Sequence, residues 1–454
     1  MTASFAERKA VGLDQKLAAI SAEFTHWLDV TQANHPLEKH HTQVRAITAH
    51  LDGRRRSTAE LLDEALKENT VLDEGRNIES LILGIRRIWE FFRAKLVQRR
   101  DDDLRAYLQL VDELAWGYYK PVFDQFPKAR REPPLVFLNG GLSPFALSRD
   151  QAFPAESVPG EPLGGRTYDE VLQRLPIPII GVPWYQTAHL PDLPVVAHET
   201  GHAIEHDFQW HAQIVARIAD ALSGTPGAGH TAAWSAWASE VFADAWGCRA
   251  LGPAYAWALR DFLVQSKRSV AQEVATDTDK YPPATLRILI CAELLESEFP
   301  DEANTCRTDW LAAYGHGNMP GYDADVPHVA EALTLTHPGF LSVAFDKNDW
   351  KAAGGACAEV KRGEMPGSAT SAARLVAAAR RLYDEDPKLF ATEKWSDLLM
   401  RQTEEIIRPG TRAGEAKRSD DEIEALTVRD IKDGVEAFDD FKIWVGLTTK
   451  APQP

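Results

Sequence analysis

The chain has 454 residues, of which 44% are hydrophobic and 26% are charged, and its formal net charge is −17. This composition is that of a folded protein with a sizeable core, so long disordered stretches are not expected. Acidic residues are spread over both halves and would repel phosphate backbones, which disfavours nucleic acid as a main partner.

The cysteines and the N-terminus bear on the compartment. The four cysteines form no Cys-x-x-Cys pair, which argues against a cysteine zinc site or redox motif and favours free thiols. The N-terminus lacks the basic start and apolar run of a secretory signal, and no segment approaches the ~20 apolar residues that span a bilayer. We therefore expect a cytoplasmic protein that does not bind membranes. The cysteines are Cys248, Cys291, Cys306 and Cys357.

Helical periodicity dominates residues 12–126, where apolar residues recur three and four positions apart, as at Leu81, Ile85 and Ile88. No acidic residue accompanies the histidines of this region at ligand spacing, so they are not expected to bind metal. The predicted breaks in the helices are His35-Pro36, Asp52-Gly53 and the charge run Arg99–Asp103.

Two stretches further on predict strands. Residues 131–147 combine prolines, a Gly-Gly pair and short apolar runs. Residues 176–185 (PIPIIGVPWY) predict a strand with edge character, because proline cannot donate to a ladder. Helical periodicity returns at Pro194 and continues to the end. The expected fold is mainly α with a small β-sheet (α+β), in three regions at 1–130, 131–300 and 301–454.

The stretch VVAHETGHAIEHDFQW carries the first motif that predicts chemistry. It contains His198-Glu199-Thr200-Gly201-His202, and on a helix residues four apart lie on the same face. His198 and His202 can therefore bind one zinc ion at about 2.0–2.1 Å each. Glu199 would project beside the ion and act as the base that accepts a proton from an activated water.

Local features support a helix here. Asp192 is expected to cap it and Pro194 to pre-set its first turn. Gly201 costs about 1 kcal/mol relative to alanine inside a helix. A gap beside the metal, or the close approach of another backbone, would explain that glycine. The motif alone could also be a helix with two surface histidines.

A second motif, Glu240-Val241-Phe242-Ala243-Asp244, follows in a helical run predicted from Ala232 to about Leu251 and capped by Thr231. Catalytic zinc commonly has three protein ligands, and two histidines with one glutamate are a known set. Glu240 is the expected third ligand, and Asp244 is expected to orient a histidine, most simply His198. Four aromatic residues predict a largely buried helix, where unpaired carboxylates are costly: Trp234, Trp237, Phe242 and Trp246.

Together the motifs resemble those of the gluzincin metallopeptidases, the thermolysin-like arrangement of zincins. Their signature is His-Glu-x-x-His on one helix and Glu-x-x-x-Asp on a later one. The resemblance covers roughly residues 176–250 and implies a zincin-like catalytic core within 131–300, flanked by helical regions and holding one zinc ion per chain. The two motifs are further apart here than in compact thermolysin-like enzymes, which allows an insertion whose flexible part would be Gly224–Gly229. The Gly-x-Met-Glu-Asn signature of the aminopeptidase members is absent.

Other zincin patterns fit less well. A metzincin would need glycine and then histidine or aspartate where Glu205 and Phe208 stand. His206 would lie about 12 Å from His198 along the helix axis, too far to share the metal. Asp207 stays open as a ligand only if the helix ends sharply enough to turn it inward.

Amide hydrolysis also needs a donor for the oxyanion of the tetrahedral intermediate. Tyr281-Pro282-Pro283 followed by Arg287 is one candidate segment, because bacterial zincins of related appearance carry a similar one. It could equally be a plain loop-to-helix junction. His316, between Gly315 and Gly317, is a loop histidine that could reach a cleft or simply be exposed. The site residues expected on this basis are Glu199, Tyr281, Arg287 and His316 for catalysis, with Asp244 behind the ligands.

These expectations amount to a zinc metallopeptidase acting on a peptide or protein substrate. An extended peptide would pair with a strand from 176–185 or from 135–147. A zinc amidohydrolase, a protease with a single target and an inert zinc-stabilised scaffold remain alternatives. The flanking helical regions could wall the cleft or bind a protein partner, and their residues do not select among these roles.

Overall fold

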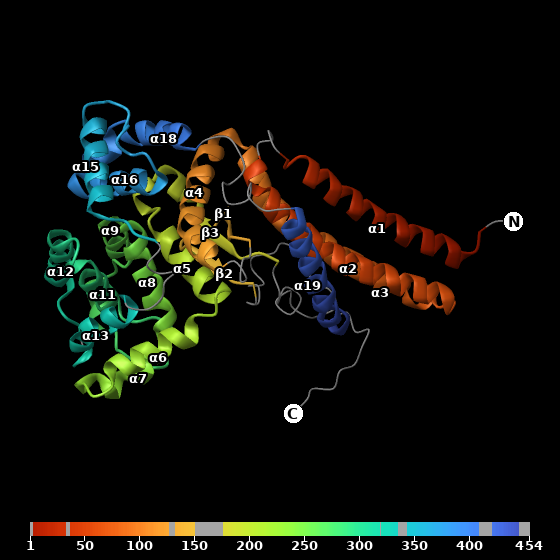
Figure 1. Cartoon of the computed structure of the whole chain (residues 1–454), viewed down its shortest axis with the longest axis horizontal. Coiled ribbons are helices and arrows are strands. Elements are labelled where there is room, and N and C mark those ends of the chain that lie inside the picture. Colours follow the sequence, from red (N-terminus) through yellow and green to blue (C-terminus); the bar gives the residue numbers. More distant parts are fainter. Residues whose placement is uncertain are drawn as a thin grey trace. The chain divides into compact units, whose positions relative to one another are not determined.

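The computed structural model of the chain describes residues 3–32, 37–126, 132–149, 176–317, 319–334, 343–407 and 420–444. Helices dominate these residues, with one small sheet among them (Figure 1). The predicted fold class, mainly α with a small β-sheet, is therefore confirmed. The expected break at His35-Pro36 and the first residue of the stretch 131–147 lie outside the described residues.

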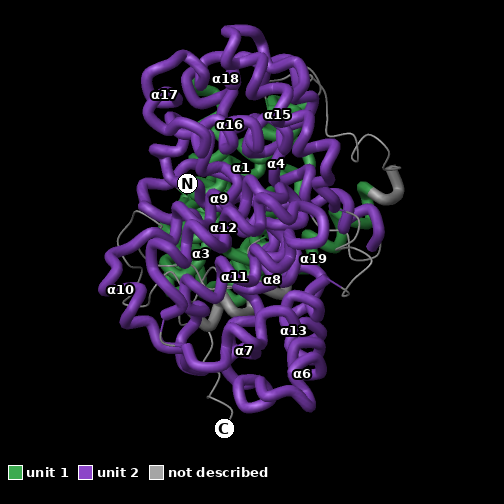
Figure 2. Tube along the Cα trace, turned by 90° about the vertical axis from the view of Figure 1, so that its left-hand side faces the viewer, with its two compact units in different colours: residues 1–101, 147–178, 409–454 green, residues 102–146, 179–408 purple. Residues whose placement is uncertain are grey.

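Two compact units make up the chain (Figure 2). Unit 1 comprises residues 1–101, 147–178 and 409–454, and unit 2 comprises residues 102–146 and 179–408. The three consecutive regions expected at 1–130, 131–300 and 301–454 stay a prediction, and the two units have other bounds. The physical reason is packing: the helix at 102–125 contacts the strands and helices of unit 2, whereas the helix at 420–444 contacts the helix at 41–67.

Unit 1 contains the long helices α1 (Phe5–Asp29), α2 (His41–Lys67), α3 (Val71–Val97) and α19 (Asp420–Trp444), with short 3-10 turns η1 (Glu38–His40) and η2 (Gln98–Arg100). Helix α1 packs against α2 and α3, and α19 packs against α2 (Figure 1). A capping box between Ser4 and Glu7 begins α1. Its buried stripe has the spacing that makes one face of a helix apolar: Leu13, Leu17, Ile20, Phe24 and Trp27.

The predicted break at Asp52-Gly53 is wrong, because α2 runs through both residues. The glycine serves close packing instead. A Cβ atom on Gly53 would collide with the backbone oxygen of Ile431 in α19, and a Cβ atom on Gly434 would collide with the backbone oxygen of His50. Glycine on both helices therefore lets the two backbones approach, at the usual cost of glycine within a helix.

The sheet of unit 2 has the strand order β1-β3-β2, formed by β1 (Leu135–Asn139), β2 (Phe145–Leu147) and β3 (Ile179–Pro183). The expected strands are confirmed, but the edge character expected for 176–185 is wrong because β3 is central. Strand β3 pairs in parallel with β1, with Leu135 opposite Ile179. Its prolines do not interrupt the ladder, because Pro178 precedes the strand and Pro183 is its last residue.

Helices surround this sheet in unit 2 and supply most of its core. The elements before the second motif are α4 (Asp102–Gln125), η6 (Trp184–Ala188), η7 (Leu190–Asp192), α5 (Val195–Asp207), α6 (His211–Leu222), η8 (Pro226–His230) and α7 (Thr231–Ala236). Those from the second motif onward are α8 (Ala238–Leu251), α9 (Pro253–Phe262), α10 (Lys267–Ala271), α11 (Ala284–Glu296), α12 (Pro300–Tyr314), α13 (Tyr322–Thr334), α15 (Lys347–Lys361), α16 (Ala372–Glu385), α17 (Pro387–Thr392) and α18 (Trp395–Ile406).

The helix beginnings differ in detail from expectation. Asp192 does not cap α5, because it belongs to the 3-10 turn η7, and Pro194 is the capping residue with no side-chain hydrogen bond. The run expected from Ala232 to Leu251 is interrupted at Trp237, where α7 ends and α8 begins. Thr231 is the first residue of α7 and not its cap, since its hydroxyl donates to the carbonyl of Ala228.

Helix α8 lies inside the core of unit 2. Nearly all of its residues are buried, including the aromatic residue Trp246. Trp234 and Trp237, just before the helix, are buried as well. The segment Gly224–Gly229, expected to be the flexible part of an insertion, forms the end of a helical connection in which η8 follows α6. Within the described residues, no helix has both the length and the apolar character needed to cross a bilayer.

Candidate metal centre

Helices α5 and α8 carry the two motifs and pack directly against each other. Gly201 explains how closely they approach. A Cβ atom at this position would lie 3.0 Å from Cα of Ala243 and 3.0 Å from Cβ of Trp246. The expectation that another backbone approaches Gly201 is therefore confirmed, and the missing side chain brings the histidines of α5 to the carboxylates of α8.

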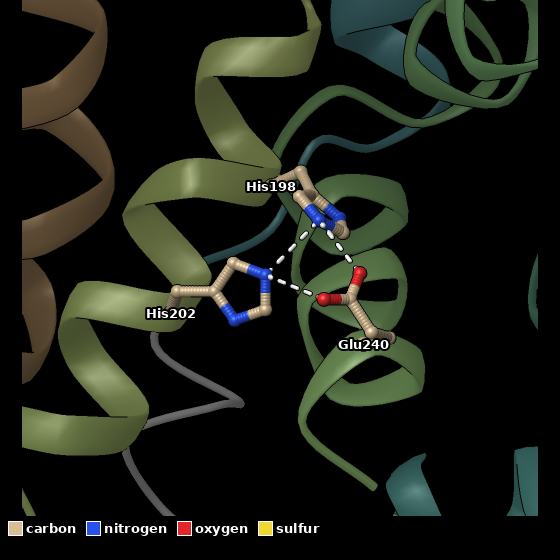
Figure 3. Close-up of side chains that lie close together, drawn as sticks. All are labelled: His198, His202 and Glu240. Carbon is tan, nitrogen blue, oxygen red and sulfur yellow. Dashed lines mark hydrogen bonds and ion pairs between the residues drawn. The ribbon is translucent and has the colours of Figure 1, made fainter. Parts of the chain in front are cut away.

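Three side chains from these helices converge on one point (Figure 3). The Nε2 atoms of His198 and His202 are 3.1 Å apart. Nε2 of His198 lies 3.4 Å from Oε2 of Glu240, and Nε2 of His202 lies 3.6 Å from Oε1 of the same carboxylate. One ligand atom from each residue falls within 4.8 Å of the others, so the group could hold a metal ion.

The spacing suits a small tetrahedral cation. Two ligand atoms at 2.0–2.1 Å from such an ion are separated by about 3.3 Å, which is close to the three separations measured here. Oε2 of Glu240 is buried and has no hydrogen-bonding partner. A buried carboxylate oxygen without a partner is costly, and a cation between the imidazoles would satisfy it. The residues present therefore fit a bound metal ion.

Asp244 orients the first ligand, as the sequence predicts. Its Oδ1 lies 3.0 Å from Nδ1 of His198, which leaves Nε2 of the ring directed at the ligand group. Tyr255 of α9 adds a contact that the motifs do not reveal. Its hydroxyl donates to Oδ1 of Asp244 at 2.6 Å and lies 3.1 Å from Nδ1 of His198. Gly247 admits the tyrosine ring, because a Cβ atom there would lie 2.5 Å from it.

Arg287 is part of this site, but its guanidinium group is directed at a protein carboxylate. Its Nε donates to Oδ2 of Asp244 at 2.8 Å, and its Nη2 donates to Oδ1 at 2.7 Å. Nη2 also lies 3.8 Å from Oε2 of Glu240. A buried bidentate pair of this kind fixes the carboxylate that fixes His198. The predicted role of Arg287 as a donor to the oxyanion has no support in this geometry, which makes it a positioning residue.

The electrostatics of the site favour a positive charge between the ligands. Burial lowers the pKa of His198, but the neighbouring carboxylates of Asp244 and Glu240 outweigh burial and raise the pKa to about 9. Burial raises the pKa of Glu240, yet His198 and the other nearby cations lower it overall. Without a metal, protonated His198 and Arg287 therefore balance the two buried carboxylates, and a cation at the ligand group would take the place of the proton on His198.

The second ligand has an orienting chain of its own, which sequence reasoning missed. Nδ1 of His202 lies 3.1 Å from Oγ of Ser239, and this hydroxyl donates to Oε2 of Glu205. Oε1 of Glu205 in turn lies 2.7 Å from Nδ1 of His211. Burial raises the pKa of Glu205, but its bonds to His202, His211 and Ser239 lower it to about 2. The only available signal was Ser239 standing next to a predicted ligand.

Glu199 is buried on α5 between the two histidines in sequence. Its carboxylate has no hydrogen bond or ion pair within the described part of the chain. By contrast, Glu205, Glu240 and Asp244 are all engaged by neighbouring groups. Glu199 is thus the acid of this helix pair whose carboxylate has no such partner among the described residues.

The other predicted residues lie outside the ligand group. Tyr281 is 53% exposed in the segment before α11, and His316 is exposed between α12 and α13. Their proposed contacts with substrate stay predictions. Asp207 is not a ligand, because its Oδ2 accepts a 2.5 Å hydrogen bond from the hydroxyl of Tyr119. His206 is likewise not part of the group.

Compared with models of protein families, with curated proteins and with solved structures, the chain matches none at a significant level.

Proposed function

We propose that this protein is a zinc-dependent peptidase in which His198, His202 and Glu240 hold the metal and Glu199 is the general base. The observation that carries the proposal is the convergence of the three ligand groups beside a buried and otherwise unengaged glutamate. A structural zinc site would fill its fourth position with protein, whereas a catalytic one keeps it open. In the described residues, the ligand group consists of three side chains.

Zinc is the metal proposed because two imidazoles and one carboxylate are the donor set of many catalytic zinc sites. Calcium and magnesium prefer sites made of oxygen ligands, which this one is not. Metal analysis of the purified protein should give about one zinc per chain. Loss of that zinc from a His202→Ala variant would tie it to this site.

A bound zinc ion would acidify a water molecule and polarise the carbonyl group of the scissile bond. Glu199 would take the proton from the attacking water and deliver it to the nitrogen of the leaving amine. Asp244, held by Arg287 and Tyr255, would keep Nδ1 of His198 engaged, so that its Nε2 stays directed at the ligand group. Ser239 and Glu205 would do the same for His202.

The substrate class proposed is a peptide or protein, and a protein partner could bind through the helical regions. A cytoplasmic location is also proposed, supported by four buried cysteines that are free thiols. A non-peptide amide substrate or a single protein target would appear in the experiment below as zinc without digestion of mixed peptides. If the wild type binds zinc but hydrolyses no amide tested, and so behaves like Glu199→Gln, an inert scaffold would be favoured.

The test is digestion of a mixed peptide library by the zinc-loaded protein, read by mass spectrometry. Glu199→Gln should keep its zinc and lose turnover by at least about a thousandfold, because the base is removed and the ligands remain. The matched control is Glu405→Gln on the exposed face of α18, which should leave activity unchanged. Undiminished hydrolysis by Glu199→Gln would refute the assignment of the base.

A further inference from the structure

A cavity of about 610 Å³ lies in unit 2 and is lined in part by α5 and α9, the helices that carry His198 and Tyr255. Its walls come from the loop after β1, the η6–η7 segment after β3, the start of α5, the end of α9 and one residue of α16. A volume of this size is typical of small-ligand sites and would hold a long side chain together with part of its backbone.

Two helices connect the cavity to the metal centre. Val195 lines the cavity and lies four residues before Glu199, so the two residues share one face of α5. Ala258 also lines it and lies three residues after Tyr255, the partner of Asp244, on α9. Along each helix the separation is about one turn, roughly 5 Å. A group seated in the cavity would therefore contact α5 and α9 about one helical turn from Glu199 and Tyr255.

The charge at the cavity wall is negative. Asp192 and Asp261 line the cavity, whereas neither lysine nor arginine does. Asp261 is already paired with Arg260 and Arg380 behind the wall. Asp192 is the less compensated of the two, because among the described residues its carboxylate forms an ion pair with His189 alone, with Nδ1 3.0 Å from Oδ2. Asp192, which was predicted to cap α5, thus lines the cavity and forms an ion pair with His189.

Aromatic and acceptor groups accompany Asp192. Tyr185, His189 and Tyr383 contribute rings to the lining, and rings of this kind attract cations. Burial and the charge of Asp192 raise the pKa of Tyr185, whose hydroxyl donates to the carbonyl of Leu142 at 2.8 Å. The side chain of Gln186 is 2% exposed and its Oε1 has no hydrogen-bonding partner. Because Gln186 lines the cavity, this acceptor is the one that a donor seated there would satisfy.

Apolar groups complete the lining. Val195, Ala258 and Leu263 offer surface for an aliphatic stem. Lysine and arginine side chains combine such a stem with a charged head that donates several hydrogen bonds. A neutral apolar side chain would add no partner for Asp192 beyond His189 and would leave Oε1 of Gln186 without one, which is costly once water is excluded.

We infer that this cavity binds the basic side chain of a lysine or arginine residue, with Asp192 as the counter-charge, and that it gives the enzyme a preference for basic peptides. The binding preference itself needs only the cavity. Its use as a substrate pocket rests on the proposed peptidase function.

The first experiment measures binding without catalysis. The probes are Nα-acetyl-arginine amide and Nα-acetyl-citrulline amide, which have nearly the same shape but differ in charge, and both lack a free α-amine. The wild-type zinc protein should bind the arginine probe at least about tenfold more tightly, as read by ligand-observed NMR titration. Equal affinities would overturn the inference, and this comparison needs no variant.

Asp192→Asn should abolish the difference between the two probes, and Gln186→Met should reduce it severalfold. Asp220→Asn is the matched control, because Asp220 is exposed on α6 and does not line the cavity. An unchanged preference in Asp192→Asn, at an unchanged melting temperature, would contradict the role given to this carboxylate.

The second experiment uses fluorogenic peptides that differ only in one arginine or citrulline. The wild type should cleave the arginine peptide with at least a tenfold higher kcat/KM, and Asp192→Asn should cleave both alike. Hydrolysis without any preference would sink the pocket assignment alone. Arginine binding with no hydrolysis of any peptide would sink the peptidase proposal and leave the pocket standing.

Discussion

Arg287 holds both oxygens of the Asp244 carboxylate, through Nε at 2.8 Å and Nη2 at 2.7 Å. Because the same carboxylate fixes His198, the position of one metal ligand depends on a residue of a third helix, α11. Both residues are buried, and burial together with the mutual charge makes each sensitive to the loss of the other.

Arg287→Lys should lower the affinity for zinc about 10- to 100-fold, because lysine cannot bind both oxygens of Asp244 at once. Chelator competition would measure the affinity. The control is Arg401→Lys on the exposed face of α18, which should change nothing. Wild-type zinc affinity in Arg287→Lys would show that the pair does not position the ligand.

Gly201→Ala should destabilise unit 2 by about 1–3 kcal/mol, because the added methyl group meets the backbone of Ala243 at 3.0 Å. Zinc affinity should fall as well, since the clash pushes α5 away from α8. Gly117→Ala is the matched control: its helix position has open space, so the change should stabilise by up to about 1 kcal/mol. Urea unfolding of both variants checks the pair, and equal effects of the two substitutions would contradict the packing argument.

Zinc should raise the melting temperature of the metal-free protein, because an ion that binds only the folded state stabilises it. At a hundredfold excess over Kd the gain is about 2.7 kcal/mol. Glu240→Gln should remove most of this gain, since the neutral amide is a poor ligand. Calorimetry with and without chelator would measure the shift in melting temperature for the wild type and for Glu240→Gln. A shift of the same size in both proteins would place the zinc elsewhere.

Tyr281→Phe and His316→Ala test the two remaining catalytic candidates. If either side chain donates to the oxyanion, its removal should lower kcat by about 100-fold or more and leave zinc content unchanged. The predicted split is a loss in kcat with little change in KM. A variant with normal kcat removes that residue from the list of catalytic candidates.

Lys95 of α3 should make unit 1 less stable at neutral than at alkaline pH. Burial lowers its pKa from 10.5 to about 7, so between these values the unfolded chain binds the proton and the folded chain does not. Stability then rises with pH across this window, by about 1.4 kcal/mol per unit at most. Below about pH 7 the full penalty remains.

Lys95→Met should therefore stabilise by up to about 4 kcal/mol at pH 7, and the gain should shrink steadily towards pH 10. Urea midpoints of both proteins at several pH values would reveal the trend. Lys67→Met, at an exposed position near the end of α2, is the control and should give no such slope. A gain that does not depend on pH would mean that the effect is only one of packing.

Residue spacing was enough to predict most of the helices and the three side chains that could hold a metal ion. The periodicity of apolar residues predicted the helices of 12–126, and the glycine and proline stretches predicted the strands. The four-residue spacing within each motif predicted that His198 and His202 share a face, and likewise Glu240 and Asp244. These are short-range properties, since a helix repeats every 3.6 residues whatever surrounds it.

Long-range packing decided the rest. Strand β3 is central because it lies between β1 and β2, whereas its prolines had suggested an edge strand. The packing of α5, α8 and α9 brings Tyr255, Ser239 and Glu205 to the site. Arg287, predicted to contact the substrate, binds Asp244 instead. Asp192, predicted to cap α5, lines a cavity instead. Sequence spacing specifies which side chains share a helix face, but which faces meet depends on burying apolar surface over the whole unit, and only the folded chain shows that choice.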